Sequence, residues 1–331
     1  MKFTESMLEG YSQPLSATED EQCKNAIRMV ADALKKLGFT DDNMTITPLY
    51  PDTLAYSLQL RRSSDSRKIK LFVQGSYANN TNVRTESDVD VAVIQEEIFC
   101  TEYRSSGTPC PQSDADYGFS KAAPAAKSFK DEVQEALEAK FGSDVERKNK
   151  SIKVHGNTYR KDADTVPCGR YRDYRQDYNH DESNYVRGVV IYPDKGGIII
   201  NYPEQHIANG RKKNVATNQH YKKMVRIMKK MRYLMEDSGN FIFRYAAGNV
   251  SSFMLESLLW NIEDSWYTEN CGRYRKVVAF SLLISTLLNR KSKFKSDYKE
   301  ANGIKPLCAS DSDYDHLCDF LDYLASFYEY Q

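Results

Sequence analysis

Residues 75–94 read Gly-Ser-Tyr-Ala-Asn-Asn-Thr-Asn-Val-Arg-Thr-Glu-Ser-Asp-Val-Asp-Val-Ala-Val-Ile, and this stretch decides the fold. Its Gly-Ser turn follows an apolar run at 71–73, and eleven residues separate Ser76 from Asp88. The apolar tail is rich in β-branched residues and predicts a buried strand. Because side chains at i and i+2 share one face of a strand, Asp88 and Asp90 are expected to point the same way.

Two adjacent carboxylates repel each other, which raises their pKa values unless a cation lies between them. Hard oxygen ligands suit Mg²⁺, which proteins hold with a few carboxylates plus substrate phosphates. The Gly-Ser turn can offer backbone N–H groups and a hydroxyl to a triphosphate, and Gly75 lets the backbone approach closely. Either motif alone is usually an ordinary turn. Their combination at this spacing predicts two-metal nucleotidyl transfer, with ions roughly 4 Å apart.

The composition narrows the class of protein. The 331 residues carry 46 basic and 46 acidic side chains, so no global charge attracts nucleic acid or an anionic membrane. Seven cysteines without a Cys-x-x-Cys pair favour reduced thiols over a disulfide scaffold or a zinc site. The longest apolar helical stretch, 277–288, is too short to cross a bilayer, and no signal-peptide pattern opens the sequence. We therefore expect a cytoplasmic protein that does not enter membranes.

The N-terminal half mixes helix and strand periods. A long amphipathic helix is predicted at about 19–37, begun by a capping box from Thr18 to Glu21 and ended by Gly38. Residues 104–125, rich in Ser, Gly, Pro and Ala, predict a surface loop. The other predicted elements of this half are strands at about 54–60, 152–159 and 163–171, a hairpin of 186–192 with 198–202, and a helix at 126–141.

From about residue 218 the chain becomes helical. The predicted helices are 221–236, 252–262, 275–288 and 313–328. The chain is therefore expected to be an α+β protein with domains at 1–215 and 216–331, and with a ligand cleft between them.

Two-metal sites commonly need a third carboxylate from a neighbouring strand. Asp162 and Asp164, in the stretch Lys-Asp-Ala-Asp-Thr-Val-Pro-Cys, lie on one face of a predicted strand. Strand propensity does not separate the two candidates.

Further motifs make the chain resemble the bacterial cGAS/DncV-like nucleotidyltransferases, the CD-NTases, and most closely their clade E (CdnE). The matching motifs run in family order over roughly residues 5–262: Glu5-Ser6-x-Leu8-Glu9, the Gly-Ser and Asp-x-Asp stretch, Ala163-Asp164-Thr165-Val166, Asn201-Tyr202-Pro203, His206, Asn209-Gly210, Thr217-Asn218, Tyr221-Lys222, Val225-Arg226-Ile227-Met228-Lys229 and Ser252-Phe253-Met254-Leu255-Glu256.

The resemblance implies a polymerase-β-like nucleotidyltransferase core with an N-terminal brace helix and a C-terminal helical (OAS-like) domain. It implies an enzyme that joins nucleoside triphosphates into a cyclic oligonucleotide. That product activates a separate effector protein in CBASS anti-phage signalling. We expect a monomer.

The resemblance also assigns metal roles to three carboxylates, with Mg²⁺ or Mn²⁺ as two bound ions. Asp88 and Asp90 hold the ion that bridges the triphosphate. Asp90 and Asp164 flank the ion that activates the attacking hydroxyl, and Asp162 becomes a flanking residue.

Three further residues are expected at the phosphates. Ser76 is predicted to contact the outer phosphates, the alternative being a plain turn. Lys229 matches the family lysine that neutralises the triphosphate, the alternative being a solvated lysine. Ser252 matches a phosphate-contacting serine, the alternative being a helix N-cap.

Base choice is expected to depend on Asn201, whose amide follows the apolar run 198–200 and can both donate to and accept from a base edge. In clade E relatives an Asn at the matching position is linked with uracil recognition; the alternative is an Asx-turn. Gln74 could also approach a base or sugar. We therefore expect UTP as a substrate, with ATP or GTP as further possibilities, and cyclic di-UMP or cyclic UMP-AMP as the product.

Three alternatives stay open at this stage. The first is a purine-specific cyclic dinucleotide synthase with a product such as c-di-GMP. The second is a linear nucleotidyltransferase that acts on RNA or a small acceptor. The third is a catalytically inactive nucleic-acid sensor, against which the three intact aspartates argue. The basic residues at 211–213 and 222–230 give no strong indication of nucleic-acid binding.

Overall fold

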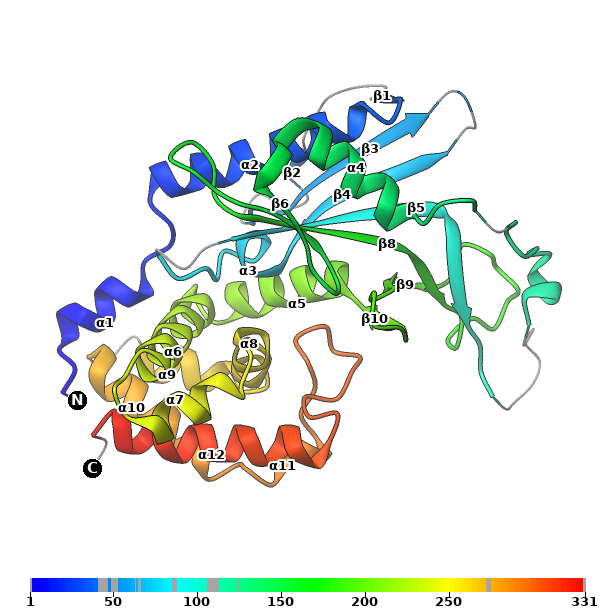
Figure 1. Cartoon of the computed structure of the whole chain (residues 1–331). Coiled ribbons are helices and arrows are strands. Elements are labelled where there is room, and N and C mark those ends of the chain that lie inside the picture. Colours follow the sequence, from blue (N-terminus) through cyan, green and yellow to red (C-terminus); the bar gives the residue numbers. More distant parts are fainter. Residues whose placement is uncertain are drawn as a thin grey trace. The chain divides into compact units, whose positions relative to one another are not determined.

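The computed structural model describes residues 2–40, 47–48, 53–62, 64, 67–84, 88–105, 113–123, 125–271 and 275–329. The chain forms two compact units (Figure 1). The sheet unit consists of 17–78 and 88–204. The helical unit consists of 1–16, 79–87 and 205–331.

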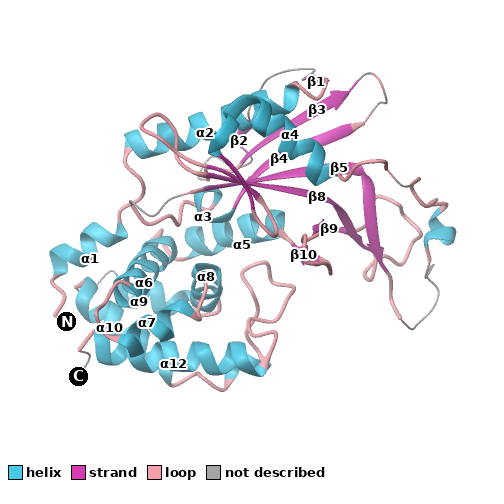
Figure 2. Cartoon of the chain, in the orientation of Figure 1, coloured by secondary structure: helices cyan, strands magenta, loops and turns pink. Residues whose placement is uncertain are grey.

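A ten-stranded sheet forms the centre of the sheet unit, and Figure 2 shows its strands in magenta. Its order is β1-β3-β4-β5-β8-β7-β6; β2 pairs with β3, and β9 pairs with both β8 and β10. Among the strand pairs of the described residues, only β5 and β8 run parallel. The strands are β1 (Phe39–Thr40), β2 (Thr47–Pro48), β3 (Tyr56–Arg62), β4 (Lys68–Gln74), β5 (Val89–Glu102), β6 (Val145–Arg147), β7 (Ile152–Val154), β8 (Ala163–Asp173), β9 (Val186–Ile191) and β10 (Ile199–Asn201).

Two helices pack together over β5 and β8 and lie on the same side of the sheet in Figure 1: α2 (Ala17–Lys35) and α4 (Phe129–Phe141). The buried face of α2 carries the apolar residues whose helical spacing predicted it. The short helix α3 (Gly75–Ala78) follows β4 directly.

The helical unit is built around α6 (His220–Glu236), which packs against α1, α7, α8, α9 and α12. The remaining helices are α1 (Glu5–Ser12), α5 (Pro203–Ala216), α7 (Phe241–Gly248), α8 (Ser252–Trp260), α9 (Asp264–Cys271), α10 (Lys276–Leu288), α11 (Lys293–Ser296) and α12 (Asp311–Phe327). No helix in the described part of the chain combines the length and apolarity needed to span a bilayer.

The predicted elements are confirmed with shifted ends. The helix predicted at 19–37 is α2, which begins at Ala17, so Thr18 lies inside it and the capping-box prediction is wrong. The helix ends at Lys35, and Gly38, which was predicted to end it, lies in the turn that follows, with a positive φ of 84°. Within the predicted loop, Asp114–Tyr117 form a 3₁₀ turn, whereas 106–112 and 124 lie outside the described residues.

The two units are not consecutive in sequence. We predicted a boundary at 215/216, whereas the structure passes from sheet unit to helical unit between 204 and 205, before most of α5. Residues 79–87 also belong to the helical unit, although their flanks belong to the sheet unit. Strand and helix periods could not reveal this crossing, because it depends on contacts between residues distant in sequence.

Candidate active site

The register of three strands brings the predicted carboxylates together. Asp90 on β5 lies directly opposite Asp164 on the parallel strand β8, and opposite Gln74 on the antiparallel strand β4. Asp88 immediately precedes β5, two residues before Asp90. Neighbouring strands lie roughly 4.8 Å apart, so side chains at matched positions are neighbours on one face. The sheet therefore gathers Asp88, Asp90 and Asp164 at the start of β5 and β8.

The Gly-Ser turn touches this group directly. Gly75 has a positive φ of 69°, which L-residues with a side chain rarely adopt. A Cβ on Gly75 would stand 2.9 Å from Cγ of Asp90 and would overlap its Oδ2. Glycine is thus required at this position for two reasons: its backbone angle, and the lack of room for a Cβ beside Asp90. Ser76 follows as the second residue of α3.

Asp162 and Asp164 have different surroundings. Asp162 accepts hydrogen bonds from the Gly156 backbone N–H (2.5 Å) and pairs with Lys153 Nζ (2.6 Å). Burial acts to raise the pKa of Asp162, but these two partners outweigh it and the pKa is lowered. Asp164 receives one long bond from Ser151 Oγ (3.4 Å). Asp162 is thus held by partners of its own, and the role of Asp164 as the reactive carboxylate stays a prediction.

Asp88 carries the electrostatic signature expected of such a group. Burial is the largest cause that raises its pKa, and the charge of Asp164 is the next. Lys153 acts in the opposite direction but does not cancel the rise. The charge of Asp164 thus disfavours the charged form of Asp88, a condition that a bound cation would relieve.

Sequence reasoning missed Lys153 and Ser151, which touch or face this group. Lys153 on β7 lies opposite Asp164 in the antiparallel pair of β7 and β8. Pairing the two predicted strands 152–159 and 163–171 as a hairpin would have revealed it.

The donor set fits a divalent cation of the Mg²⁺ type. All three side chains offer carboxylate oxygen, the ligand that Mg²⁺ prefers. Among the described residues, no three His, Cys, Asp or Glu side chains come together closely enough to hold a metal by themselves. Mg²⁺ sites of this chemistry are commonly completed by substrate phosphates and water rather than by protein alone.

The other predicted site residues are divided between the units. Asn201 ends β10 in the sheet unit, half-buried and opposite Val189 on β9. Gln74 ends β4, also half-buried. Lys229 and Ser252 belong to the helical unit.

Lys229 lies on α6 with only 2% of its side chain exposed. Its Nζ donates to Glu256 Oε2 (2.7 Å) and to Thr81 Oγ1 (3.1 Å). The alternative of a solvated surface lysine is therefore wrong. A contact between Lys229 and a triphosphate stays a prediction.

Ser252 is the first residue of α8, but it is not the cap. Ser251 caps the helix, its hydroxyl accepting from the Met254 backbone N–H at 3.1 Å. The N-cap alternative for Ser252 is therefore wrong by one position, and its contact with phosphate stays a prediction.

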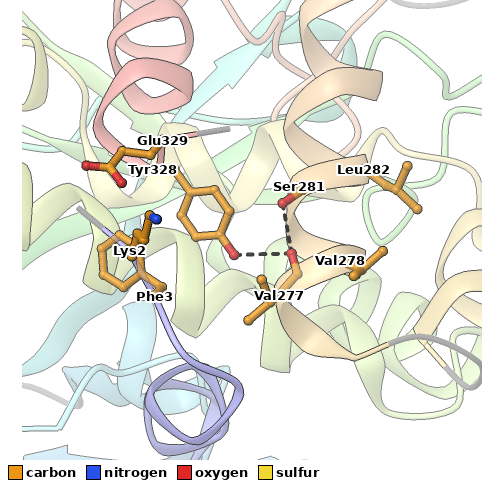
Figure 3. Close-up of a pocket in the computed structure, with 8 residues that line it drawn as sticks. All are labelled: Lys2, Phe3, Val277, Val278, Ser281, Leu282, Tyr328 and Glu329. Carbon is orange, nitrogen blue, oxygen red and sulfur yellow. Dashed lines mark hydrogen bonds between the residues drawn. The ribbon is translucent and has the colours of Figure 1, made fainter. Parts of the chain in front are cut away.

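A pocket of about 440 Å³ in the helical unit involves none of these residues (Figure 3). Tyr328 Oη and Ser281 Oγ both donate to the Val277 carbonyl, at 3.1 and 2.9 Å. The pocket is lined by Lys2, Phe3, Val277, Val278, Ser281, Leu282, Tyr328 and Glu329. We assign it no part in catalysis.

Comparison with known proteins gives the family. Residues 208–330 match the cGAS/DncV-like nucleotidyltransferase C-terminal helical domain. The cyclic GMP-AMP synthase CdnE03 of Staphylococcus schleiferi is 44% identical over 333 residues, which cover 100% of this chain and 98% of the relative. The cyclic dipyrimidine nucleotide synthase CdnE of Cecembia lonarensis is 36% identical over 262 residues, 79% of this chain and 76% of the relative.

A solved structure agrees with these relatives. The Rhodothermus marinus CdnE c-UMP-AMP synthase, determined with Apcpp and Upnpp, has a TM-score of 0.71 and 26% identity, and the match covers 99% of this chain and 97% of that one. Full-length identity, the helical-domain match and the fold all agree with the expectation drawn from the sequence. The chain belongs to the cGAS/DncV-like nucleotidyltransferases, the CD-NTases, among their CdnE cyclic dinucleotide synthases.

Proposed function

We propose that this protein joins two nucleoside triphosphates into a cyclic dinucleotide at the carboxylates of Asp88, Asp90 and Asp164. The observation that supports it most is the register of β5 and β8, in which Asp90 faces Asp164 while Gly75 lies against Asp90. Each bond forms when a hydroxyl of one nucleotide attacks the α-phosphorus of the next and pyrophosphate leaves. A second transfer within the linear intermediate closes the ring.

Two divalent ions, Mg²⁺ or Mn²⁺, would supply positive charge to the triphosphate and to the attacking hydroxyl. Asp88 and Asp90 would hold one ion, and Asp90 and Asp164 the other. The raised pKa of Asp88 follows from burial and from Asp164, so a neighbouring cation would stabilise its charged form. The carboxylates thus orient the reacting groups and balance the bound charge.

The phosphates are proposed to lie against the Gly-Ser turn. Ser76 would donate its hydroxyl to an outer phosphate, and Gly75 allows the backbone to approach closely. Ser252 would donate a second hydroxyl. Lys229 would add a charge-assisted contact, its ammonium then being shared with Glu256 and Thr81.

For base choice we propose that Asn201 selects uracil, with Gln74 as a further contact to base or sugar. An amide matches the adjacent O4 and N3–H of uracil in one bidentate contact, as amides do with base edges in nucleic acids. Cyclic di-UMP or cyclic UMP-AMP is then the product. The C. lonarensis and R. marinus relatives, by their names, make products of this kind.

A purine product is the second candidate. It is favoured by the S. schleiferi relative, which is named a cyclic GMP-AMP synthase and matches this chain at 44% identity over its whole length. In that case neighbouring residues of the pocket, rather than the Asn201 amide, determine the base.

Omission of single nucleotides separates the two candidates. Wild-type protein is given all four triphosphates, then each mixture lacking one of them, and the cyclic products are identified by mass spectrometry. Loss of product without UTP, and a shift toward purines in Asn201→Ser, support uracil selection. An unchanged product when UTP is omitted, and again when CTP is omitted, rejects uracil selection and establishes the purine product.

We further propose that the enzyme acts as a monomer in the cytoplasm and that its product activates a separate effector protein in anti-phage signalling. Membership of the family supports this proposal. Addition of purified product to the effector encoded beside this protein, with measurement of the effector's activity, tests it.

A further inference from the structure

The segment that connects the Gly-Ser turn to Asp88 is anchored in the helical unit. We call its described part, residues 79–84, the spacer. Asn79 and Thr81 are fully buried, and Asn82 and Val83 are nearly so. Such burial is unusual for a connection between two parts of one active site, because loops ordinarily run over the surface.

Glu256 on α8 is the centre of this anchor. Its Oε2 accepts from Thr81 Oγ1 at 2.8 Å and from Lys229 Nζ at 2.7 Å. Its Oε1 lies 2.9 Å from His206 Nε2 on α5. One buried carboxylate thus joins the spacer to α5, α6 and α8 at once.

Two neighbouring positions of the spacer are held as well. The Asn80 carbonyl accepts from Arg226 Nη1 at 2.5 Å, and Arg226 Nε donates to the Ser12 carbonyl at 2.7 Å. The Asn79 amide lies 3.3 Å from the His206 ring. A Cβ at Gly210 of α5 would stand 2.8 Å from Asn79 Oδ1, so α5 fits around the spacer only with glycine there.

The carboxylate at the centre of this anchor carries a negative charge. Burial acts to raise the pKa of Glu256, but Lys229 and then His206 overcome it, and the pKa lies well below its ordinary value. The carboxylate is therefore charged, and hydrogen bonds to a buried charged group are among the stronger ones in proteins. Such a network fixes the positions of the groups that it joins.

The spacer follows α3, which carries Ser76, and precedes Asp88 in the chain, so both ends of the motif are attached to it. We propose that Thr81 and Glu256 are positioning residues for nucleotidyl transfer, which hold the spacer so that the Gly-Ser turn and Asp88 face one nucleotide. This proposal rests on the function proposed above. In this proposal both residues act through the backbone that joins the two halves of the motif, since Thr81 belongs to the spacer and Glu256 accepts its hydroxyl.

Thr81→Val tests the proposal, because it removes the hydroxyl that bonds Glu256 and keeps the shape of the side chain. Since an offset of about 1 Å can cost on the order of a hundredfold in rate, we expect kcat to fall about tenfold or more while KM for the triphosphates changes less than about threefold. Thr81→Ser keeps the hydroxyl and should restore kcat to within about twofold of wild type. Glu256→Gln should lower kcat in the same way.

Tyr267→Phe is the matched control. It deletes another buried hydroxyl of the helical unit, which donates to the carbonyl of Leu259, a residue outside the spacer, at 2.8 Å. The control should keep the wild-type kcat even if its melting temperature falls as far as that of Thr81→Val. Equal loss of kcat in the two variants, or wild-type kcat in Thr81→Val, overturns the proposal.

Amide hydrogen exchange separates this proposal from the function on which it rests. In Thr81→Val, peptides covering 75–90 should exchange faster while those of α12 stay unchanged. If wild-type protein makes no cyclic product, the proposed function fails, and the exchange still decides the anchor. Unchanged exchange across 75–90 contradicts the anchor whatever the activity.

Discussion

At the scale of single residues, the site brings together carboxylates whose negative charges repel one another. Burial and the charge of Asp164 both act against the charged form of Asp88, and Lys153 only partly compensates. Folded protein therefore binds a proton at Asp88 more readily than unfolded chain does. At neutral pH the charge of Asp88 therefore destabilises the ligand-free protein. This destabilisation decreases as the pH falls and the Asp88 carboxylate takes up a proton.

Asp88→Asn should accordingly stabilise the ligand-free protein while abolishing catalysis. At pH 7 we expect a rise in melting temperature on the order of 1–2 °C, because the buried charge is gone. The difference from wild type should shrink as the pH falls toward 4, where Asp88 itself becomes neutral. Thermal scans over this pH range, without metal or nucleotide, measure it. A variant less stable than wild type at pH 7 would contradict the raised pKa.

Asp164 and Asp162 should respond differently to the same change. Asp164→Asn is expected to lower the rate of product formation by about a hundredfold or more. It removes the negative charge that lies opposite Asp90, at the position where charge develops during the proposed reaction. Asp162→Asn removes a part-exposed pair with Lys153, which is worth about 1 kcal/mol or less, and should leave the rate nearly unchanged. Initial rates of product formation decide between them. The reverse pattern would make Asp162 the reactive carboxylate.

At the scale of elements, the turn between β4 and α3 is the most demanding local structure. Gly75→Ala should lose activity, since the new methyl group would displace the Asp90 carboxylate. Gly118→Ala is its matched control: Gly118 also has a positive φ, 72°, but nothing lies within 4 Å of an added Cβ. Both variants should lose roughly 1 kcal/mol of stability from backbone strain, and only Gly75→Ala should lose its rate. Equal rates in the two variants would show that Asp90 tolerates displacement.

The strands and long helices could be predicted because their signal is local. The β-branched run at the start of β5 and the helical periods of α2, α6, α10 and α12 lie within each element. The prediction missed α1, α5, α7 and α9, and also the four-residue α11. α1, α7 and α9 are only eight residues long, too short for a helical period to stand out, and α5 carries Gly210 and several polar residues.

At the scale of the whole molecule, the carboxylates could be found from the sequence but their support could not. Asp88 and Asp90 lie in one short motif, and the family resemblance selected Asp164. The anchor of the spacer depends on Thr81 meeting Glu256, 175 residues away in sequence. A sequence pattern within one segment does not indicate a contact with a residue so far away in the chain. The same reason explains why residues 79–87 join the helical unit, which no periodicity indicated.

The central claim is that these carboxylates build a cyclic dinucleotide. Wild-type protein and the Asp88→Asn/Asp90→Asn double variant are incubated with all four triphosphates and Mg²⁺, treated with phosphatase, and analysed by mass spectrometry. A cyclic product has no terminal phosphate and therefore resists phosphatase. We expect wild-type protein to yield such a dinucleotide, with a mass that corresponds to the loss of two pyrophosphates. The folded double variant should yield no cyclic dinucleotide. Only phosphatase-sensitive linear products from wild type, or an equal yield of the cyclic product from the double variant, would contradict the account.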